Sequence, residues 1–336
     1  MAHGPLSVAL ASAEELDRVA RGDAGRVLLA IRYGSPRAAV AHLPFPVLDV
    51  PNRILDAGPA VELWRSSEPV RVRTRGRFAC AESDHAMFAA AVCPVTEDLE
   101  ADTFALYREL LAVAAEAAFP ALQRLWNCIP GINGPQRGEE RYKLFSAGRA
   151  LGYEDRFGPG AERHFPASSA VGTSGDALIV WFLAGRDAGR HHENPRQVSA
   201  FRYPSQYGTR SPSFARGTLA PGSLGNAFFL SGTASVVGHE SRHEGDVLRQ
   251  LDETLRNIDA LSTAVAVGPE PPLSRFQYLR VYIRRPSDFD AVRNALTQRL
   301  GTSTVCLYLQ AEICRAELLL EIEGVALQPT VSRPRM

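Results

Sequence analysis

The chain has 336 residues, of which 37 are basic and 37 acidic, so its formal net charge is zero. Domains usually span about 100–200 residues, which predicts two domains or one large one. The neutral balance argues against binding to nucleic acid or to acidic membranes, because both need a basic surface. No apolar run approaches the ~20 residues of a membrane-spanning helix, and the N-terminus lacks the basic start of a signal peptide. A cytoplasmic protein is expected.

Arginine supplies almost all of the positive charge, since Lys143 is the only lysine in the sequence. Schiff-base chemistry on lysine is therefore nearly excluded. The arginine excess fits either a GC-rich genome or a substrate with carboxylates, which guanidinium groups bind in bidentate pairs. The five cysteines are scattered and form no CxxC motif. This pattern argues against a disulfide framework or a structural zinc site and favours a reducing compartment.

The first two thirds of the chain predict short strands followed by a strand and helix alternation. Near the N-terminus, apolar runs mixed with proline and glycine predict strands and turns at residues 26–33 and 42–50. Helical spacing of apolar residues, closed by Pro120, predicts a helix over 102–119. We also expect strands at residues 89–93, 122–129 and 176–183, and a second helix at residues 138–151.

A long polar stretch follows at residues 184–225, rich in Arg, Pro, Ser and Tyr and with almost no aliphatic periodicity. A loop of this length inside a compact chain is usually functional or disordered. Its aromatic residues argue against disorder. We therefore expect a functional loop.

The last third is more regular. In the helix predicted at 247–261, Leu248, Leu251, Leu255 and Ile258 share one apolar face. The other elements expected here are strands at 226–232, 276–283, 305–309 and 316–327 and a helix at 286–300.

The middle and C-terminal thirds show the same order of elements, which indicates two related α+β units. In such units the helices cover one face of a mixed sheet, and the other face is free to pack on a neighbouring unit. A pocket at the seam between units is the default binding site. We predict an α+β fold divided into segments 1–85, 86–220 and 221–336.

Residues 226–327 resemble one unit of the YjgF/Rid family. The resemblance rests on the strand ending in Ser231-Gly232, the segments LRQLDETLRNIDAL, YLRVYI and SDFDAVRNAL, and above all the closing CRAELLLEIEGVAL. Rid proteins are usually trimers with sites between their subunits. The resemblance implies tandem Rid-like units in one chain, in a pseudo-trimer-like arrangement that allows a monomer to form such a site.

Six further segments in the right order resemble the chorismatase family, over roughly residues 85–330. They are WNCIPGIN, ERYKLFSAGRA, PASSAVGT, ENPRQVSAFRYPSQYGTRSPSFARG, FFLSGTASVVGHES and CRAELLLEIEG. The N-terminal 85 residues carry no matching motif. The resemblance implies chorismate as the small-molecule substrate, release of its side chain as pyruvate, and no metal or organic cofactor. Neither nucleic acid nor a membrane is expected as a partner.

Glu321 is the candidate proton donor for the acid-labile enolpyruvyl ether of chorismate. It lies in the apolar segment LLLEIEGV, where desolvation raises the pKa of a carboxyl group. Glu323 shares the same strand face, because side chains alternate with period two. The resemblance favours Glu321 as the catalytic member of the pair. The alternative interpretation is a strand carboxylate paired with an arginine.

The two carboxylates of the substrate need cationic partners. The long polar loop offers Arg202, Arg210 and Arg216, of which we favour Arg202 and Arg210, because they lie inside the best-matching segment. Tyr203 and Tyr207 could add hydroxyl hydrogen bonds. The alternative is that any one of these arginines is a surface charge. Arg149, in the AGRA segment, is a further candidate for substrate binding, with a structural role as its alternative.

Two small residues bear on the product. Within the family, the position of Cys314 and a small-residue position near Ala227 divide the products. Cysteine resembles the 3-hydroxybenzoate branch, in which a substrate hydroxyl attacks and the ring aromatises, whereas Ala227 resembles the hydrolytic branch that gives a dihydroxycyclohexadiene carboxylate. We favour the cysteine, because a thiol can take part in proton transfer. The alternative for Cys314 is a small buried hydrophobe.

Other motifs are weak. The run His191-His192-Glu193 lacks HExxH spacing, and no GxSxG, P-loop or GxGxxG motif occurs. Two competing functions stay open at this point. One is a Rid-type imine deaminase, against which the long Arg/Tyr loop argues, and the other is a non-catalytic ligand-binding protein of the same fold.

Overall fold

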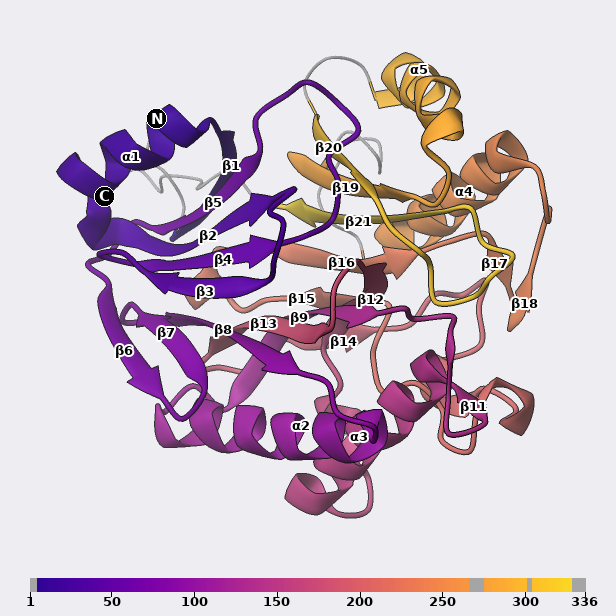
Figure 1. Cartoon of the computed structure of the whole chain (residues 1–336), viewed down its shortest axis with the longest axis horizontal. Helices are drawn as coiled ribbons and strands as arrows, with labels where there is room; N and C mark the ends of the chain where they lie inside the picture. The colour runs from indigo at the N-terminus through magenta and orange to yellow at the C-terminus, as the bar shows by residue number, and fades with distance from the viewer. Residues whose placement is uncertain (1–4, 266–274, 301–303, 328–336) are drawn as a thin grey trace, which may run out of the picture.

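The computed structural model describes residues 5–265, 275–300 and 304–327, which form three mixed sheets with helices at the periphery (Figure 1). The first sheet has the order β1-β5-β2-β4-β3. Its elements are β1 (Leu6–Ala11), α1 (Ala13–Gly22), β2 (Val27–Tyr33), β3 (Ala39–His42), β4 (Pro46–Val50) and β5 (Val61–Ser66).

The second sheet has the order β12-β9-β13-β8-β7-β6 and carries two long helices. Its elements are β6 (Arg71–Arg75), β7 (Phe78–Glu82), β8 (Ala86–Pro94), α2 (Leu99–Glu116), β9 (Ala121–Pro130), α3 (Arg141–Phe157), β12 (Ala167–Thr173) and β13 (Ala177–Gly185). A separate two-stranded ribbon, β10 (Pro135–Gln136) and β11 (Glu139–Glu140), precedes α3.

The third sheet has the order β14-β15-β16-β21-β19-β20. Its elements are β14 (Arg190–His192), β15 (Gly217–Leu219), β16 (Phe228–Thr233), α4 (Val247–Val265), β19 (Tyr278–Ile283), α5 (Phe289–Leu300), β20 (Val305–Gln310) and β21 (Leu320–Ala326). The short strands β17 (Val236–Val237) and β18 (Glu240–Ser241) pair beside it.

All three sheets share one topology. In each, the last strand lies antiparallel between the first and second core strands, as β5 does with β1 and β2, β13 with β8 and β9, and β21 with β16 and β19. In each, the third core strand pairs in parallel with the second. The expected α+β class with tandem units is therefore confirmed, and the N-terminal segment, which matched no motif, is itself a third unit with a single helix.

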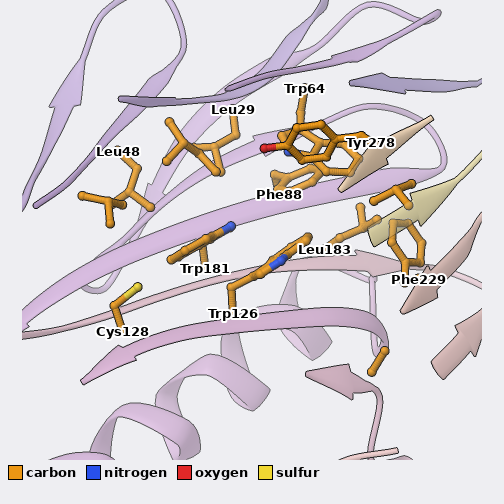
Figure 2. Close-up of a cluster of buried hydrophobic side chains, with 14 of the residues drawn as sticks. Leu29, Leu48, Trp64, Phe88, Trp126, Cys128, Trp181, Leu183, Phe229 and Tyr278 are labelled. Atoms are coloured by element: carbon orange, nitrogen blue, oxygen red, sulfur yellow. The ribbon is translucent and has the colours of Figure 1, made fainter. Parts of the chain in front are cut away.

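Side chains on the two faces of each sheet enter different cores. The helices cover one face, as where α2 and α3 pack on the second sheet and α4 and α5 on the third. The opposite faces of all three sheets meet in one central cluster (Figure 2). There Trp126 stacks on Trp181 with ring centroids 5.7 Å apart, and Trp64 from the first sheet packs on Phe88 and Phe229 from the other two. The aromatic core thus holds the three units together.

Most elements predicted from the sequence are present, with shifted ends. The helix predicted at 102–119 is α2, which begins at Leu99 because the Asp98 carboxylate accepts a hydrogen bond from the Ala101 amide. The prediction that Leu248 lies on the buried apolar face of α4 was wrong. Leu248 lies in the first turn of the helix and is 44% exposed, and the buried face begins only later, where Leu251 packs. Sequence analysis missed α1 and β12. The division at residues 85 and 220 stays a prediction, and pairing of β7 with β8 and of β15 with β16 crosses both positions.

Candidate active site

A cavity lies at the seam between the second and third units. The second unit contributes β12 and α3, and the third contributes β16, β21 and the turn before β21. Residues of the long polar loop, among them Tyr203 and Tyr207, close the remaining side. The seam pocket expected from the repeated units is therefore present, and it contains several of the predicted site residues.

Glu321 projects from β21 into this cavity and is 4% exposed. Its Oε1 has no hydrogen-bond partner among the residues that the structure describes. Burial, and next the neighbouring Glu323 carboxylate, raise the pKa of Glu321 to about 8, against the opposing charges of Arg124 and Arg216. At neutral pH this carboxyl group is mostly protonated and can donate a proton into the cavity.

The backbone opposite Glu321 is shaped to admit it. The pairing of β16 with β21 shifts register between Leu230 and Thr233, and this irregularity contains Ser231-Gly232. A Cβ atom at Gly232 would overlap the Glu321 carboxyl group. The Gly232 amide instead donates to Ser169 Oγ of β12 at 2.9 Å, which ties the two units together. Bulges of this kind often lie next to active sites, where they redirect a side chain.

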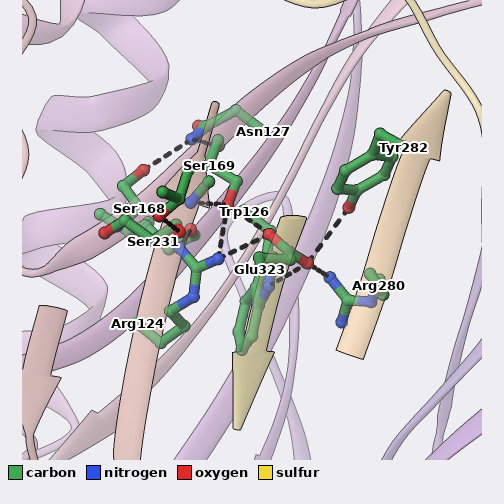
Figure 3. A network of polar contacts seen from close by, with 12 residues as sticks. Arg124, Trp126, Asn127, Ser168, Ser169, Ser231, Arg280, Tyr282 and Glu323 are labelled. Atoms are coloured by element: carbon green, nitrogen blue, oxygen red, sulfur yellow. Dashed lines mark hydrogen bonds and ion pairs between the residues drawn. The ribbon is translucent and has the colours of Figure 1, made fainter. Parts of the chain in front are cut away.

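Glu323, two residues along β21, has a different environment (Figure 3). Arg124 Nη2 donates to its Oε2 at 2.6 Å, and Arg280 Nη1 and Ser169 Oγ also donate to the carboxylate. Trp126 Nε1 and Tyr282 OH each donate to Oε1 at 3.1 Å. The alternative of a strand carboxylate paired with arginine thus describes Glu323, while Glu321 lacks such an ion pair among the described residues.

Two buried arginines in the cavity wall carry unsatisfied donors. Arg149, on α3, is 1% exposed, and its Nε and Nη2 have no hydrogen-bond partner in the described chain. Its guanidinium lies 5.1 Å from the Phe145 ring centre. Arg216 is also buried; its Nη2 donates to Tyr203 OH at 2.7 Å, while its Nε lacks a partner among the described residues. A buried guanidinium with free N–H groups is costly unless an anion binds it, so the pair suits a dicarboxylate ligand.

The polar loop is held over the cavity by stacked side chains. Arg315 lies 4.1 Å from the Tyr207 ring centre and 5.3 Å from that of Tyr203. Tyr207 OH donates to the His239 carbonyl at 2.7 Å, and Arg315 Nη1 donates to the same carbonyl at 2.9 Å. Both tyrosines were predicted from the sequence as substrate-binding residues. Arg315 was not predicted as a site residue, and it too lies in the cavity wall.

Three predicted residues lie elsewhere. Arg202 and Arg210 line a second, more open pocket, where Arg210 pairs with Glu154. Ala227 is buried in the central apolar cluster and does not line the cavity. The structure therefore does not bring these residues to Glu321. The small residues at and just after the end of β16 that line the cavity are Gly232 and Ala234.

Cys314 lies in the cavity wall, where burial raises the pKa of its thiol to about 12 and keeps it protonated. Several polar residues of the cavity wall were not expected from the sequence; they come from β11, α3, β12 and the polar loop. Their segments had been assigned to a motif or a helix without site roles; the residues are Glu140, Tyr142, Lys143, Ser168, Ser169 and Gln197.

The run at 191–193 lies outside the cavity. Burial lowers the pKa of His191 to about 4, and its Nδ1 lies 3.0 Å from Thr218 Oγ1. No group of three or more His, Cys, Asp or Glu side chains suited to a metal ion occurs among the described residues. Within the same residues, no helix has the length and apolar character needed to cross a membrane.

Comparison with known proteins gives consistent matches. A family model described as "Chorismatase FkbO/Hyg5-like, N-terminal" matches residues 62–184. The chain is 33% identical over 297 residues to a protein named 3-hydroxybenzoate synthase from Streptomyces hygroscopicus, covering 84% of this chain and 86% of the relative. It is 34% identical over 273 residues to a chorismatase from Streptomyces rapamycinicus, covering 79% and 81%. A crystal structure of a chorismatase superposes with a TM-score of 0.88 at 30% identity, covering 97% of this chain and 99% of that one.

Proposed function

Because this chain belongs to the chorismatase family, we propose that it converts chorismate to pyruvate and 3-hydroxybenzoate without a cofactor. The observation that carries the proposal is the buried Glu321 carboxyl group, unpartnered at Oε1 among the described residues, facing a cavity with two buried arginines that carry unsatisfied N–H groups. Burial raises the pKa of Glu321 and favours its protonated form. Chorismate needs a proton donor for its vinyl ether and cations for its two carboxylates. The cavity offers both.

In this proposal the arginines bind the substrate. Arg149 and Arg216 bind the carboxylates through their free N–H groups, which replaces an unfavourable buried charge with charge-assisted hydrogen bonds. Arg315, stacked on Tyr207, adds positive charge at the loop side of the cavity. Exclusion of water by the loop strengthens these interactions. Arg202 and Arg210 have no direct role, since they line another pocket.

Glu321 then starts the reaction. It donates its proton to the methylene carbon of the enolpyruvyl group, which gives an oxocarbenium ion and leaves Glu321 as a carboxylate. The substrate's 4-hydroxyl oxygen attacks ring carbon 3 as the bond from this carbon to the side-chain oxygen breaks, and pyruvate leaves. The original bond between this oxygen and carbon 4 then breaks as carbon 3 loses its proton, which leaves the oxygen on carbon 3 and gives the aromatic ring. Two protons are released, one from the substrate hydroxyl and one from ring carbon 3. One of them protonates the phenol oxygen and the other protonates the Glu321 carboxylate, so no water is consumed.

Cys314 supports attack by the substrate hydroxyl rather than by water. Its thiol stays protonated, and it occupies the cavity wall near Glu321, whose charge contributes to the raised pKa of the thiol. A soft, weakly hydrogen-bonding sulfur disfavours an ordered water molecule there. The hydrolytic product, a dihydroxycyclohexadiene carboxylate, is the alternative outcome if water reaches the ring.

Incubation of the protein with chorismate, with separate assays for pyruvate and for aromatic product, tests the proposal. We expect equal amounts of pyruvate and 3-hydroxybenzoate. Pyruvate with a non-aromatic diol would assign the chain to the hydrolytic branch, and no pyruvate would refute the proposal. Glu321→Gln should reduce turnover about 10²–10⁴-fold, whereas Glu312→Gln, which changes an exposed carboxylate in the neighbouring segment, should leave it unchanged.

A further inference from the structure

Glu321 and Glu323 lie on the same face of β21, yet among the described residues only Glu323 forms ion pairs. Glu323 accepts hydrogen bonds from five side chains, two of them arginines (Figure 3). Glu321 Oε1 accepts none from the described residues. The two carboxyl groups therefore differ in environment although their backbone positions are equivalent.

Glu323 belongs to a buried cluster whose charges balance. Arg280 donates to Glu62 through Nε at 2.7 Å and Nη2 at 2.6 Å, and it also contacts Glu323. Arg124 pairs with Glu323 on its other side. All four side chains are at most 3% exposed. Two carboxylates and two guanidiniums leave no net charge, so a further carboxylate at position 321 would have no counter-ion within the cluster.

Charged groups outside this cluster also act on Glu321, and the largest electrostatic effect on its pKa is that of Glu323. Among those that act on it, Glu323 raises its pKa, while Arg124, on β9, and Arg216, beside β15, lower it. Arg124 is already paired with Glu323, whereas Arg216 bonds only neutral groups, Tyr203 and the Val198 carbonyl, and keeps a free Nε, so its charge opposes that of Glu323 at Glu321. Three neutral acids with raised pKa values lie near it, namely Tyr142 on α3, Tyr282 on β19 and Cys314 in the turn before β21. The other charged residues that line the same cavity are Glu140, Lys143, Arg149 and Arg315.

We propose that Glu323 is a positioning residue whose fixed negative charge keeps the Glu321 carboxyl group protonated between turnovers. This inference rests on the proposed function of Glu321. Ser169 makes the arrangement rigid, because its Oγ donates to Glu323 and accepts from the Gly232 amide opposite Glu321. The same charge drives return of a proton to Glu321 when the ring aromatises, since two adjacent buried carboxylates are unfavourable.

The test compares Glu323→Gln with Glu62→Gln across pH. Both substitutions remove one carboxylate bound to Arg280, but only Glu323 acts directly on Glu321. In Glu323→Gln, the pH above which kcat/KM falls should move down by about one unit or more, so the activity at high pH falls roughly tenfold further than at low pH. In Glu62→Gln, which removes a carboxylate from the cluster but leaves Glu323 beside Glu321, this pH should move down by clearly less than in Glu323→Gln. If kcat/KM begins to fall at the same pH in Glu323→Gln and in wild type, the inference is overturned.

Two further measurements keep the inference testable if Glu323→Gln does not fold. The double variant Arg124→Gln, Glu323→Gln retains the balanced Glu62–Arg280 pair. The pH above which its kcat/KM falls should still lie below that of wild type, because Glu323 acts on Glu321 more strongly than Arg124 does. An unshifted pH would refute the charge argument. Infrared difference spectra, wild type minus Glu321→Gln, follow the Glu321 carboxyl without turnover. They test the inference even if chorismate is not the substrate, whereas absence of pyruvate from wild type refutes only the proposed function.

Discussion

The Glu321 carboxyl group lies where the side chain of any residue larger than glycine at position 232 would have to be. The two residues come from adjacent strands, β16 and β21, at the point where their register shifts. The space that this glycine leaves is thus what allows an uncompensated carboxyl group to sit in the cavity wall.

Substitution of Gly232 should therefore act on chemistry more than on folding. In Gly232→Ala the added methyl group displaces the Glu321 carboxyl, and we expect kcat to fall by about 10²-fold or more, since small misplacements at a reacting centre are costly. The matched control is Gly222→Ala, where a Cβ meets only Asn226 Oδ1 at 3.9 Å. Steady-state kinetics, with unfolding curves for both variants, would check this. Unchanged kcat in Gly232→Ala would contradict the placement of Glu321.

The rate should depend on pH with an upper limit. Since burial and Glu323 raise the pKa of Glu321 to about 8, the acid form that donates the proton is lost as pH rises through this value. We expect kcat/KM to fall tenfold per pH unit above about 8. A pH profile measured with chorismate over a range in which the enzyme stays folded tests this. A decline centred near the ordinary value of a glutamate would contradict it.

Ionisation of the buried Glu321 carboxyl group should also lower the free energy of unfolding at high pH. Its folded-state pKa lies above that of an unfolded glutamate, so its contribution to stability is greatest below the unfolded value and is lost as pH rises through about 8. Glu321→Gln removes this loss and should be more stable than wild type by up to about 4 kcal/mol near pH 8.5, at about 1.4 kcal/mol per unit. Urea unfolding at pH 5 and pH 8.5 would measure the difference, which should shrink at the lower pH.

Substitutions of Arg149 and Arg202 test whether the substrate binds in the cavity or in the second pocket. Arg149→Lys keeps a positive charge but loses the paired N–H geometry, so we expect kcat/KM to fall about 10–10²-fold. Arg202→Lys, a change at an exposed residue of the other pocket, should stay within about twofold of wild type, as expected for surface positions. Equal losses in both variants would mean that the loop carries Arg202 to the substrate during the reaction.

Isotope labelling tests the role of Cys314. In water enriched in ¹⁸O, wild type should give 3-hydroxybenzoate without solvent oxygen, because the attacking oxygen comes from the substrate. Cys314→Ala makes room for water and should divert a measurable fraction of the product to a labelled diol. Cys306→Ala changes a cysteine of β20 outside the cavity and should behave as wild type. Label in the aromatic product of wild type would refute the proposed attack.

Several features of this protein could be read from the sequence because they depend on local pattern. The apolar period of α4 and the run around Glu321 predict a packed helix and a buried carboxyl, and both are present. Other local signals were overlooked, such as the capping box in which Ser12 and Glu15 exchange hydrogen bonds at the start of α1. The strand β12 was missed for a different reason. Its Ser168 and Ser169 are polar because they face the cavity, and polar runs are typical of loops.

Only the tertiary structure decided which arginines reach Glu321 and which carboxylate is neutralised. The sequence favoured Arg202 and Arg210 over Arg216 as partners of the substrate carboxylates. Only Arg216 lines the cavity, because its position beside β15 is fixed by the pairing of β15 with β16. Likewise the ion pairs of Glu323 come from Arg124 and Arg280, far away in the chain. Coulomb energies depend on distance and burial, and both are set by packing of the three units. The sequence therefore determined the chemical groups and the strands expected to carry them, while the fold determined their charge states and partners.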